Sequence, residues 1–259
     1  MQKKALLSIT IAVILIVSAM LPTLAFSPDD IKAETVNYIT QNNSAISFWN
    51  MSALYAAGID VADGSFEIEV TEPVASPMPT DYAKYIFSQL MQNKNPRKSN
   101  SGTDYTKQLS KMQTENGSFS NPANQHIWAM LALDAAGMQD NRQNALLYLS
   151  SLKKADGGYS ESQNSEASYA DVTAMALVAL SRYNDDTAKS LISDAVDSLR
   201  TAWLESDALN NANTLSTVIS ALCAVDEDIF SPQWQKDERT LFDTLCEFKL
   251  ENGSFKYLA

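Results

Sequence analysis

The feature that most constrains this chain is an internal repeat of short apolar segments. Four segments rich in alanine and leucine share an Ala-Leu step, which begins at Ala53, Ala132, Ala179 and Ala221. The last three steps lie 47 and 42 residues apart, and the gap of 79 residues after the first leaves room for one degenerate copy at 81–92. Periods of this length are typical of stacked helical units. The repeat therefore predicts about five copies of one unit.

More amphipathic segments lie between the apolar ones. In the clearest, at 186–203, apolar residues recur at helical spacing while charged residues occupy the other face. One class of helix is therefore buried all round and the other is half exposed, which predicts an all-α fold with an inner ring of helices inside an outer ring. The expected outer helices span residues 29–41, 104–113, 141–153, 186–203 and 233–250.

Glycine is scarce, with 8 residues in 259, and half of these glycines begin one motif. Gly64, Gly117, Gly157 and Gly253 are each followed, after one residue, by Phe or Tyr. We expect the glycine to take a positive φ as the chain leaves an outer helix, while the aromatic ring folds back as a hydrophobic clip. A Gln or Lys four residues before the glycine can bond free carbonyls of that helix. The alternative is a row of carbohydrate-binding aromatic side chains.

This glycine motif resembles the Gln-Trp motif of the prenyltransferase and squalene oxidase repeat family, with Phe or Tyr in place of Trp. Residues 168–180 are similar to the Asp-x-Thr-Ala-Met-Ala stretch of exported bacterial members and of transcobalamin-like cobalamin-binding α-domains. The resemblance covers the chain from about Asp29 to its end. It implies an α/α-toroid, the fold of terpenoid cyclases, here incomplete with about five inner helices.

The sequence lacks the catalytic motifs of the enzymes in the family that it resembles. Squalene-type cyclases protonate their substrate with an Asp-x-Asp-Asp-Thr-Ala motif, but Tyr169 and Val172 stand where the carboxylates beside Asp171 are required. Prenyltransferases hold zinc with Asp, Cys and His, whereas His126 is the one histidine and neither cysteine lies in a suitable motif. We therefore expect no catalytic or metal residues. A Ser/His/Asp triad stays open, although no Gly-x-Ser-x-Gly motif supports one.

A ligand cavity is the functional feature that the fold favours. Inner helices of a toroid run parallel, so their N-termini gather at one mouth and their partial positive charges add there. Aromatic rings, amides and an imidazole near these N-termini suit a flat or amphipathic ligand. The candidate ligand-binding residues are Trp49, Gln125, His126, Trp128, Tyr169, Asp171 and Asn213. The alternative is that Trp49 and Trp128 only fill the axis.

The N-terminus predicts export. Lys3 and Lys4 precede an apolar stretch at 5–20, and Thr23-Leu-Ala25 is a small-residue cleavage site, so we expect a signal peptide at 1–25. An uncleaved membrane anchor is the alternative. The expected toroid domain spans residues 26–259, truncated at its C-terminus because helix 233–250 lacks an inner partner. The net charge of -12 argues against nucleic acid as a partner.

These observations predict a secreted or cell-surface, non-catalytic domain that binds a small ligand or a surface partner. A corrinoid is the most concrete ligand that the resemblance implies, and no bound cofactor is expected. The alternative is a terpenoid-cyclase-like or carbohydrate-active enzyme that uses the same cavity. Cys223 and Cys246 lie on successive predicted helices with a large axial offset, so we expect two free, mostly buried thiols.

Overall fold

The structure is a computed structural model, which describes residues 27–42, 45–140 and 142–258. Ten α-helices lie within these residues, joined by loops and two very short strands, so the predicted all-α class is confirmed. The predicted signal peptide, 1–25, lies outside the described residues. Among the helices that are described, none has the length and apolarity to cross a bilayer.

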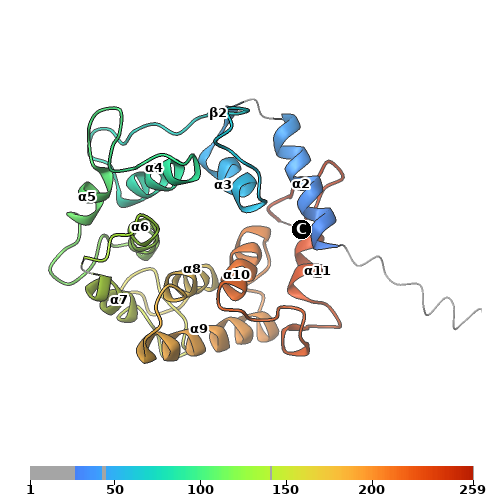
Figure 1. Ribbon diagram of the computed structural model, residues 1–259. Helices are drawn as coiled ribbons and strands as arrows, with labels where there is room; N and C mark the ends of the chain where they lie inside the picture. Colours follow the sequence, from blue (N-terminus) through green and yellow to red (C-terminus); the bar gives the residue numbers. More distant parts are fainter. Residues whose placement is uncertain (1–26, 43–44, 141, 259) are drawn as a thin grey trace, which may run out of the picture.

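Five helices form an inner set around a common centre (Figure 1). Each contacts the next along the chain, in the order α3, α4, α6, α8, α10. Several alanines of α4, α6, α8 and α10 are fully buried, as at Ala83, Ala129 and Ala176, because a small side chain lets neighbouring helices approach closely. The degenerate copy is a helix, as predicted. The bounds are α3 (Phe48–Ala56), α4 (Pro79–Met91), α6 (Ala123–Ala135), α8 (Ala170–Leu180) and α10 (Ala212–Ala224).

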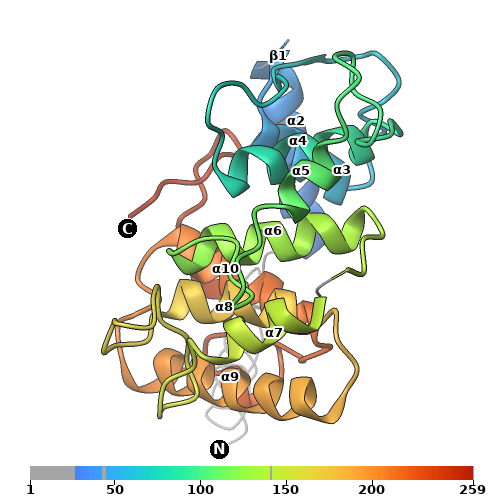
Figure 2. The same ribbon diagram turned by 90° about the vertical axis from the view of Figure 1, so that its left-hand side faces the viewer.

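The other helices lie outside this set. They are α2 (Pro28–Asn42), α5 (Tyr105–Ser110), α7 (Arg142–Ser150), α9 (Asp186–Glu205) and α11 (Leu241–Cys246). Figure 2 shows the longest, α9, beneath α8. It buries Leu191, Ala195, Leu199 and Trp203 on one face, which is the amphipathic pattern predicted for it. α5 and α7 end three residues earlier than their predicted spans.

The prediction of one continuous helix at 233–250 is wrong. The chain forms a 3-10 turn, η1 (Pro232–Trp234), and α11 begins only at Leu241. Asp237 and Glu238 between them have φ of 52° and 64°, which breaks a right-handed helix. Thr240 then caps α11, accepting from the amide of Asp243 while the Asp243 carboxylate accepts from the Thr240 amide. This capping box fixes a new helix start.

Three copies of the glycine motif lie directly against the backbone of an outer helix. Gly117, Gly157 and Gly253 have φ between 81° and 88°, as predicted. A Cβ atom at these positions would lie 2.1, 2.5 and 2.6 Å from the carbonyl oxygens of residues 144, 194 and 34. The first two oxygens belong to α7 and α9. The third belongs to Glu34 of α2, so the same contact joins the C-terminal part of the chain to its first described helix.

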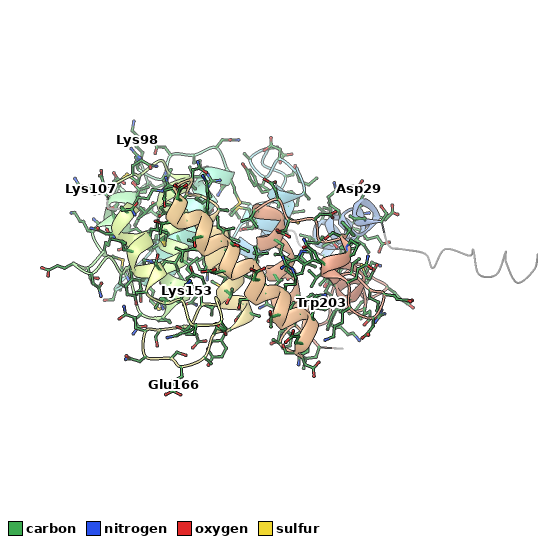
Figure 3. All side chains as sticks on the ribbon, turned by 90° about the horizontal axis from the view of Figure 1, so that it is seen from below. Asp29, Lys98, Lys107, Lys153, Glu166 and Trp203 are labelled. Atoms are coloured by element: carbon green, nitrogen blue, oxygen red, sulfur yellow. The ribbon has the colours of Figure 1, made fainter. Side chains whose placement is uncertain are left out.

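Charged side chains reinforce these contacts. Lys153 pairs with Asp194 on α9, and Figure 3 shows Lys153 beside that helix. Lys249 pairs in the same way with Glu34 on α2. We expected these side chains to bond free carbonyls of the preceding helix, but Nε2 of Gln113 donates to the carbonyl of Gly117, beyond the end of α5, at 2.9 Å. The two lysines instead reach the following outer helix.

One outer position carries no helix. Between α3 and α4 the chain runs through the extended residues 58–78, where β2 (Glu67–Ile68) pairs in parallel with β1 (Ala45–Ile46). The Gly64 copy of the motif lies in this segment. It keeps the positive φ, 85°, but a Cβ atom there would meet nothing within 4 Å. The motif at this copy therefore abuts no outer helix.

Replacing Gly157 and Gly64 by alanine distinguishes two reasons for glycine in the motif: the close contact with a helix carbonyl and the positive φ. Both glycines have a left-handed backbone, which costs an L-residue about 1–2 kcal/mol. Only Gly157 also lies against a backbone carbonyl, so Gly157→Ala should lose at least about 3 kcal/mol of unfolding free energy. Urea denaturation measures both variants. Equal losses would contradict the proposed role of the contact.

The two cysteines are free, as predicted, but only Cys246 is buried. Cys223 is exposed, so the prediction of its burial is wrong, because it lies on the face of α10 that α8 and α11 leave uncovered. Burial raises the pKa of the Cys246 thiol to about 11, with the nearby Asp243 carboxylate adding to the effect.

This difference predicts unequal thiol reactivity. In the folded chain at pH 8, Ellman's reagent should modify Cys223 and leave Cys246 intact, since a thiol reacts as its thiolate and needs access. Both should react in urea. Mass spectrometry of the labelled peptides identifies the site. Comparable labelling rates for the two thiols in the folded chain would contradict the predicted packing of α11.

Candidate functional site

Four of the inner helices line an open cavity of about 430 Å³. It is lined almost entirely by apolar side chains from α3, α4, α6 and α8. The lining residues are Phe48, Trp49, Ser52, Tyr55, Phe87, Met91, Trp128, Leu131, Asp134, Ala135, Val178 and Arg182. The volume lies in the lower part of the range found for sites that enclose small organic ligands.

Four aromatic rings form one wall of this cavity. Trp49 and Trp128 meet edge to face with their ring centroids 5.5 Å apart, and Phe48 and Phe87 pack on Trp128 at 5.9 Å each. Edge-to-face contacts of this kind fix the ring planes. Trp49 is nevertheless 58% exposed and Tyr55, on the same helix, is 54% exposed. Large apolar side chains on a rigid wall are thus left facing the open space of the cavity.

One end of the cavity is charged. The Asp134 carboxylate receives Nε of Arg182 at 2.9 Å and Nη2 of Arg142 at 3.1 Å, one on each oxygen. Arg142 also stacks on the Tyr183 ring, 4.2 Å from its centroid. The Arg182 side chain is 59% exposed, and its two terminal nitrogens make no hydrogen bond among the described residues. Of these charged groups, Asp134 and Arg182 line the cavity, and the terminal nitrogens of Arg182 are the donors that a ligand can reach there.

The structure brings together two of the seven predicted ligand-binding residues. Trp49 and Trp128 line the cavity, and they touch each other. Five others do not line it: Gln125, His126, Tyr169, Asp171 and Asn213. The cavity reaches the last turn of α6 at Asp134 and the residue Arg182 just beyond α8. It therefore extends to the C-terminal ends of these helices, whereas the sequence argument looked to their N-termini.

His126 is fully buried and faces the outer layer. Its Nδ1 accepts from the amide of Phe119 at 3.2 Å, and Nε2 lies 3.1 Å from the carbonyl oxygen of Ala145 on α7. The Tyr148 ring packs on the imidazole with centroids 4.7 Å apart. Desolvation by burial lowers the pKa of His126 to about 4, against the opposing hydrogen bond to Ala145. The histidine thus joins an inner helix to the glycine motif and to an outer helix.

The other four predicted residues make local contacts. Asp171 accepts from the Val172 amide at 2.9 Å within the first turn of α8, and Tyr169 precedes that helix with its side chain 45% exposed. Gln125 accepts from the Ser120 hydroxyl at 2.8 Å. Asn213 is exposed near the start of α10. The structure therefore spreads them over separate helix starts.

The repeat itself carried a signal for the lining residues that sequence analysis missed. On three inner helices, the residue just before the alanine of the Ala-Leu step lines the cavity. These residues are Ser52, Leu131 and Val178. On α3 and α6, the second residue after that alanine also lines the cavity. These residues are Tyr55 and Asp134. Positions spaced by three share one helix face. The repeat register thus indicates which face of each inner helix meets the centre.

Metal ligands do not gather anywhere in the described ranges: no group of three His, Cys, Asp or Glu side chains could hold an ion there. Comparison of the chain with models of protein families, with curated proteins and with solved structures found no match. The function proposed below is therefore argued from the geometry of the cavity.

The pKa of His126 predicts a measurable pH dependence. The folded imidazole should stay neutral down to about pH 4, while an unfolded chain binds its proton near pH 6.5. Between these values the unfolded state holds more protons, so the unfolding free energy falls as pH falls, by roughly 3 kcal/mol in total. Because the chain has one histidine, NMR of the ring carbons reports the titration directly. A midpoint near pH 6.5 in the folded chain would contradict this burial.

Proposed function

We propose that this chain is a binding domain whose central cavity takes a small molecule with an apolar ring system and an anionic group. The observation that carries this proposal is the exposure of Trp49 and Tyr55 toward an apolar cavity that four helices line. Large aromatic side chains left in water on a rigid surface are unfavourable for the free protein. A ligand that covers these side chains removes their apolar surface from water, which favours binding.

The ends of the cavity define the chemistry of the ligand. The aromatic wall of Trp49 and Trp128 suits the edge or face of a flat ring. At the charged end, Arg182 has terminal nitrogens that can donate to a carboxylate, sulfonate or phosphate, because Asp134 occupies only its Nε. An apolar anion therefore satisfies both ends, whereas a cation would meet the guanidinium groups.

The architecture assigned to this domain is an incomplete α/α-toroid of the prenyltransferase and squalene oxidase repeat type. Its support is the alternation of inner and outer helices and the glycine motif, repeated at Gly117, Gly157 and Gly253. With the signal segment at 1–25, the proposal places the domain outside the cytoplasm, in a secreted or cell-surface protein. In this proposal the domain binds a small molecule or a partner at the cell surface.

A non-catalytic role is favoured by the groups that line the cavity. Asp134 is the one carboxylate among them, and each of its oxygens already accepts from an arginine. Asp171, the residue that matches the cyclase motif, lies elsewhere. A corrinoid, which the resemblance implies, is larger than a cavity of 430 Å³ and would insert one edge only. A smaller aromatic anion is therefore the preferred ligand.

Ligand binding tests this function. We expect 2-naphthoate to bind the full chain and to quench tryptophan fluorescence, and the uncharged 2-naphthamide to bind more weakly. Trp49→Ala should weaken both ligands by about tenfold or more, because it removes part of the aromatic wall. Arg182→Gln should weaken 2-naphthoate alone. Titration calorimetry of the original chain and the two variants with both ligands gives the six affinities.

Tyr257→Ala is the matched control, since Tyr257 is a 63% exposed aromatic residue that does not line the cavity. It should leave both affinities unchanged. The proposal fails if the folded chain binds neither naphthalene ligand, or if the control weakens binding as much as Trp49→Ala does. Tighter binding of cyanocobalamin than of 2-naphthoate would replace the preferred ligand with a corrinoid.

A further inference from the structure

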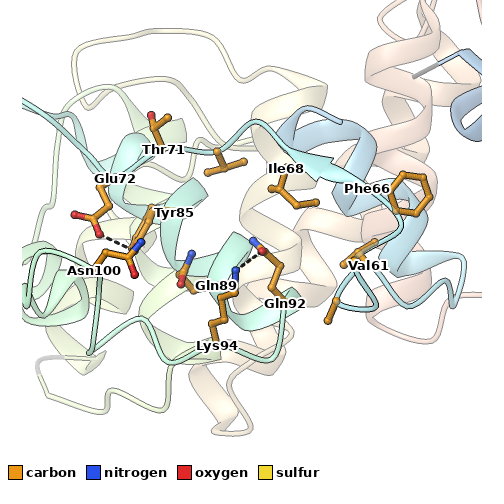
Figure 4. Close-up of a pocket in the computed structure, with 13 residues that line it drawn as sticks. Val61, Phe66, Ile68, Thr71, Glu72, Tyr85, Gln89, Gln92, Lys94 and Asn100 are labelled. Atoms are coloured by element: carbon orange, nitrogen blue, oxygen red, sulfur yellow. Dashed lines mark hydrogen bonds between the residues drawn. The ribbon is translucent and has the colours of Figure 1, made fainter. Parts of the chain in front are cut away.

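A second cavity, of about 560 Å³, lies on the outer side of α4. It exists because no outer helix occupies the position between α3 and α4. The extended chain at 61–72 covers this face of α4 only in part, and residues 94 to 100 close the other side. Figure 4 shows the polar side chains gathered at one end and Val61, Phe66 and Ile68 at the other. The central cavity shares none of these residues.

The residues of α4 that face this hollow are polar. Tyr85, Gln89 and Gln92 recur at helical spacing and line it. Where α7 packs on α6, the apolar residues Met130 and Leu133 lie beside Ala145 of α7 and are buried. The stripe on α4 differs from this packing because it is polar and lines a hollow.

A fixed carboxylate lies at the polar end. Glu72 accepts from the Tyr105 hydroxyl at 3.0 Å, from the Tyr85 hydroxyl at 3.5 Å and from the Ser101 amide at 3.3 Å. Hydrogen bonding from Ser101, with a smaller contribution from Tyr105, lowers the pKa of Glu72 against the opposing effect of desolvation, so the group is an ionised acceptor at neutral pH. The two buried tyrosines hold it in one place beside the cavity.

Amide side chains also line this cavity. The side chains of Gln89 and Asn100 line the cavity and make no hydrogen bond among the described residues. Gln92 accepts from Lys94 at 2.7 Å and donates to Ser88, which fixes its orientation. An amide offers donors and an acceptor side by side. The ammonium of Lys94 balances the charge of Glu72, so the lining has no net charge.

Phe66 completes the set of contacts. It belongs to the glycine motif and is half-buried, as Phe255 is, whereas Phe119 and Tyr159 are buried; of these four aromatic residues, Phe66 is the one that lines the cavity. This copy of the motif contacts no outer helix at Gly64. Its aromatic ring is therefore available to a ligand.

We propose that this second cavity is a saccharide-binding site. A neutral ligand with adjacent hydroxyl groups matches a lining of amides, one fixed carboxylate and one ammonium, since each hydroxyl both donates and accepts. The C–H face of a sugar ring matches Phe66 at the apolar end. A polyanion would meet Glu72, and a metal ion would find one carboxylate where several oxygen ligands are needed. The site shares no lining residue with the central cavity, and the proposal does not rest on the function proposed for that cavity.

Saturation-transfer NMR on the full chain tests this site with four probes at millimolar concentration: cellobiose, maltose, chitobiose and lactose. At least one should receive saturation and give a measurable affinity by titration. Gln89→Ala and Glu72→Gln should each weaken that affinity by about tenfold, because the first removes an amide and the second replaces a charged acceptor oxygen with an N–H donor. Gln108→Ala, an exposed glutamine on α5 outside the cavity, should have no effect.

Arg182→Gln separates the two cavities, because Arg182 lines the central one and not the second. It should leave saccharide binding unchanged. The saccharide site is refuted if the folded chain binds none of the four probes, if Gln89→Ala and Glu72→Gln bind as well as the original chain, or if Arg182→Gln abolishes binding. None of these results bears on the binding of 2-naphthoate.

Discussion

The close contact between a glycine and a helix carbonyl is the interaction on which this structure depends. At Gly117, Gly157 and Gly253 the chain leaves one outer helix and lies directly against the backbone of the next. Any side chain there would collide with a carbonyl oxygen that is itself bound into a helix. The contact sets the spacing of the outer helices, and the third copy applies the same spacing between the C-terminal segment and α2.

Both cavities follow from this spacing. Five inner helices held by the outer set pack closely through alanine on their flanks, and larger residues such as Trp49 and Trp128 meet at the centre without filling it. Where the outer helix is absent, beside α4, the same arrangement leaves a hollow on the outside. Polar side chains line that hollow and apolar ones line the centre, so the two sites suit different ligands.

The repeat predicted the helices well and the site only in part. Periodicity indicated the inner helices and the positive φ of the glycines, because both are local consequences of sequence. The break before α11 depended on the left-handed residues Asp237 and Glu238, which helical periodicity does not reveal. His126 was placed near the proposed mouth by its position in the chain, whereas a tertiary contact with Ala145 on α7 turns it outward. The positions of the lining residues relative to the Ala-Leu step repeat from helix to helix, so the sequence did indicate which face of each inner helix meets the centre.

Hydrogen exchange on Gly253→Ala tests most directly whether the glycine contact organises the fold. A Cβ atom there would lie 2.6 Å from the Glu34 carbonyl oxygen, so the variant should separate the C-terminal segment from α2. We expect amides of residues 28–42 and 247–258 to lose protection together, while those of α8 and α9 keep theirs. Unchanged protection in α2, or an equal loss throughout the chain, would contradict the account.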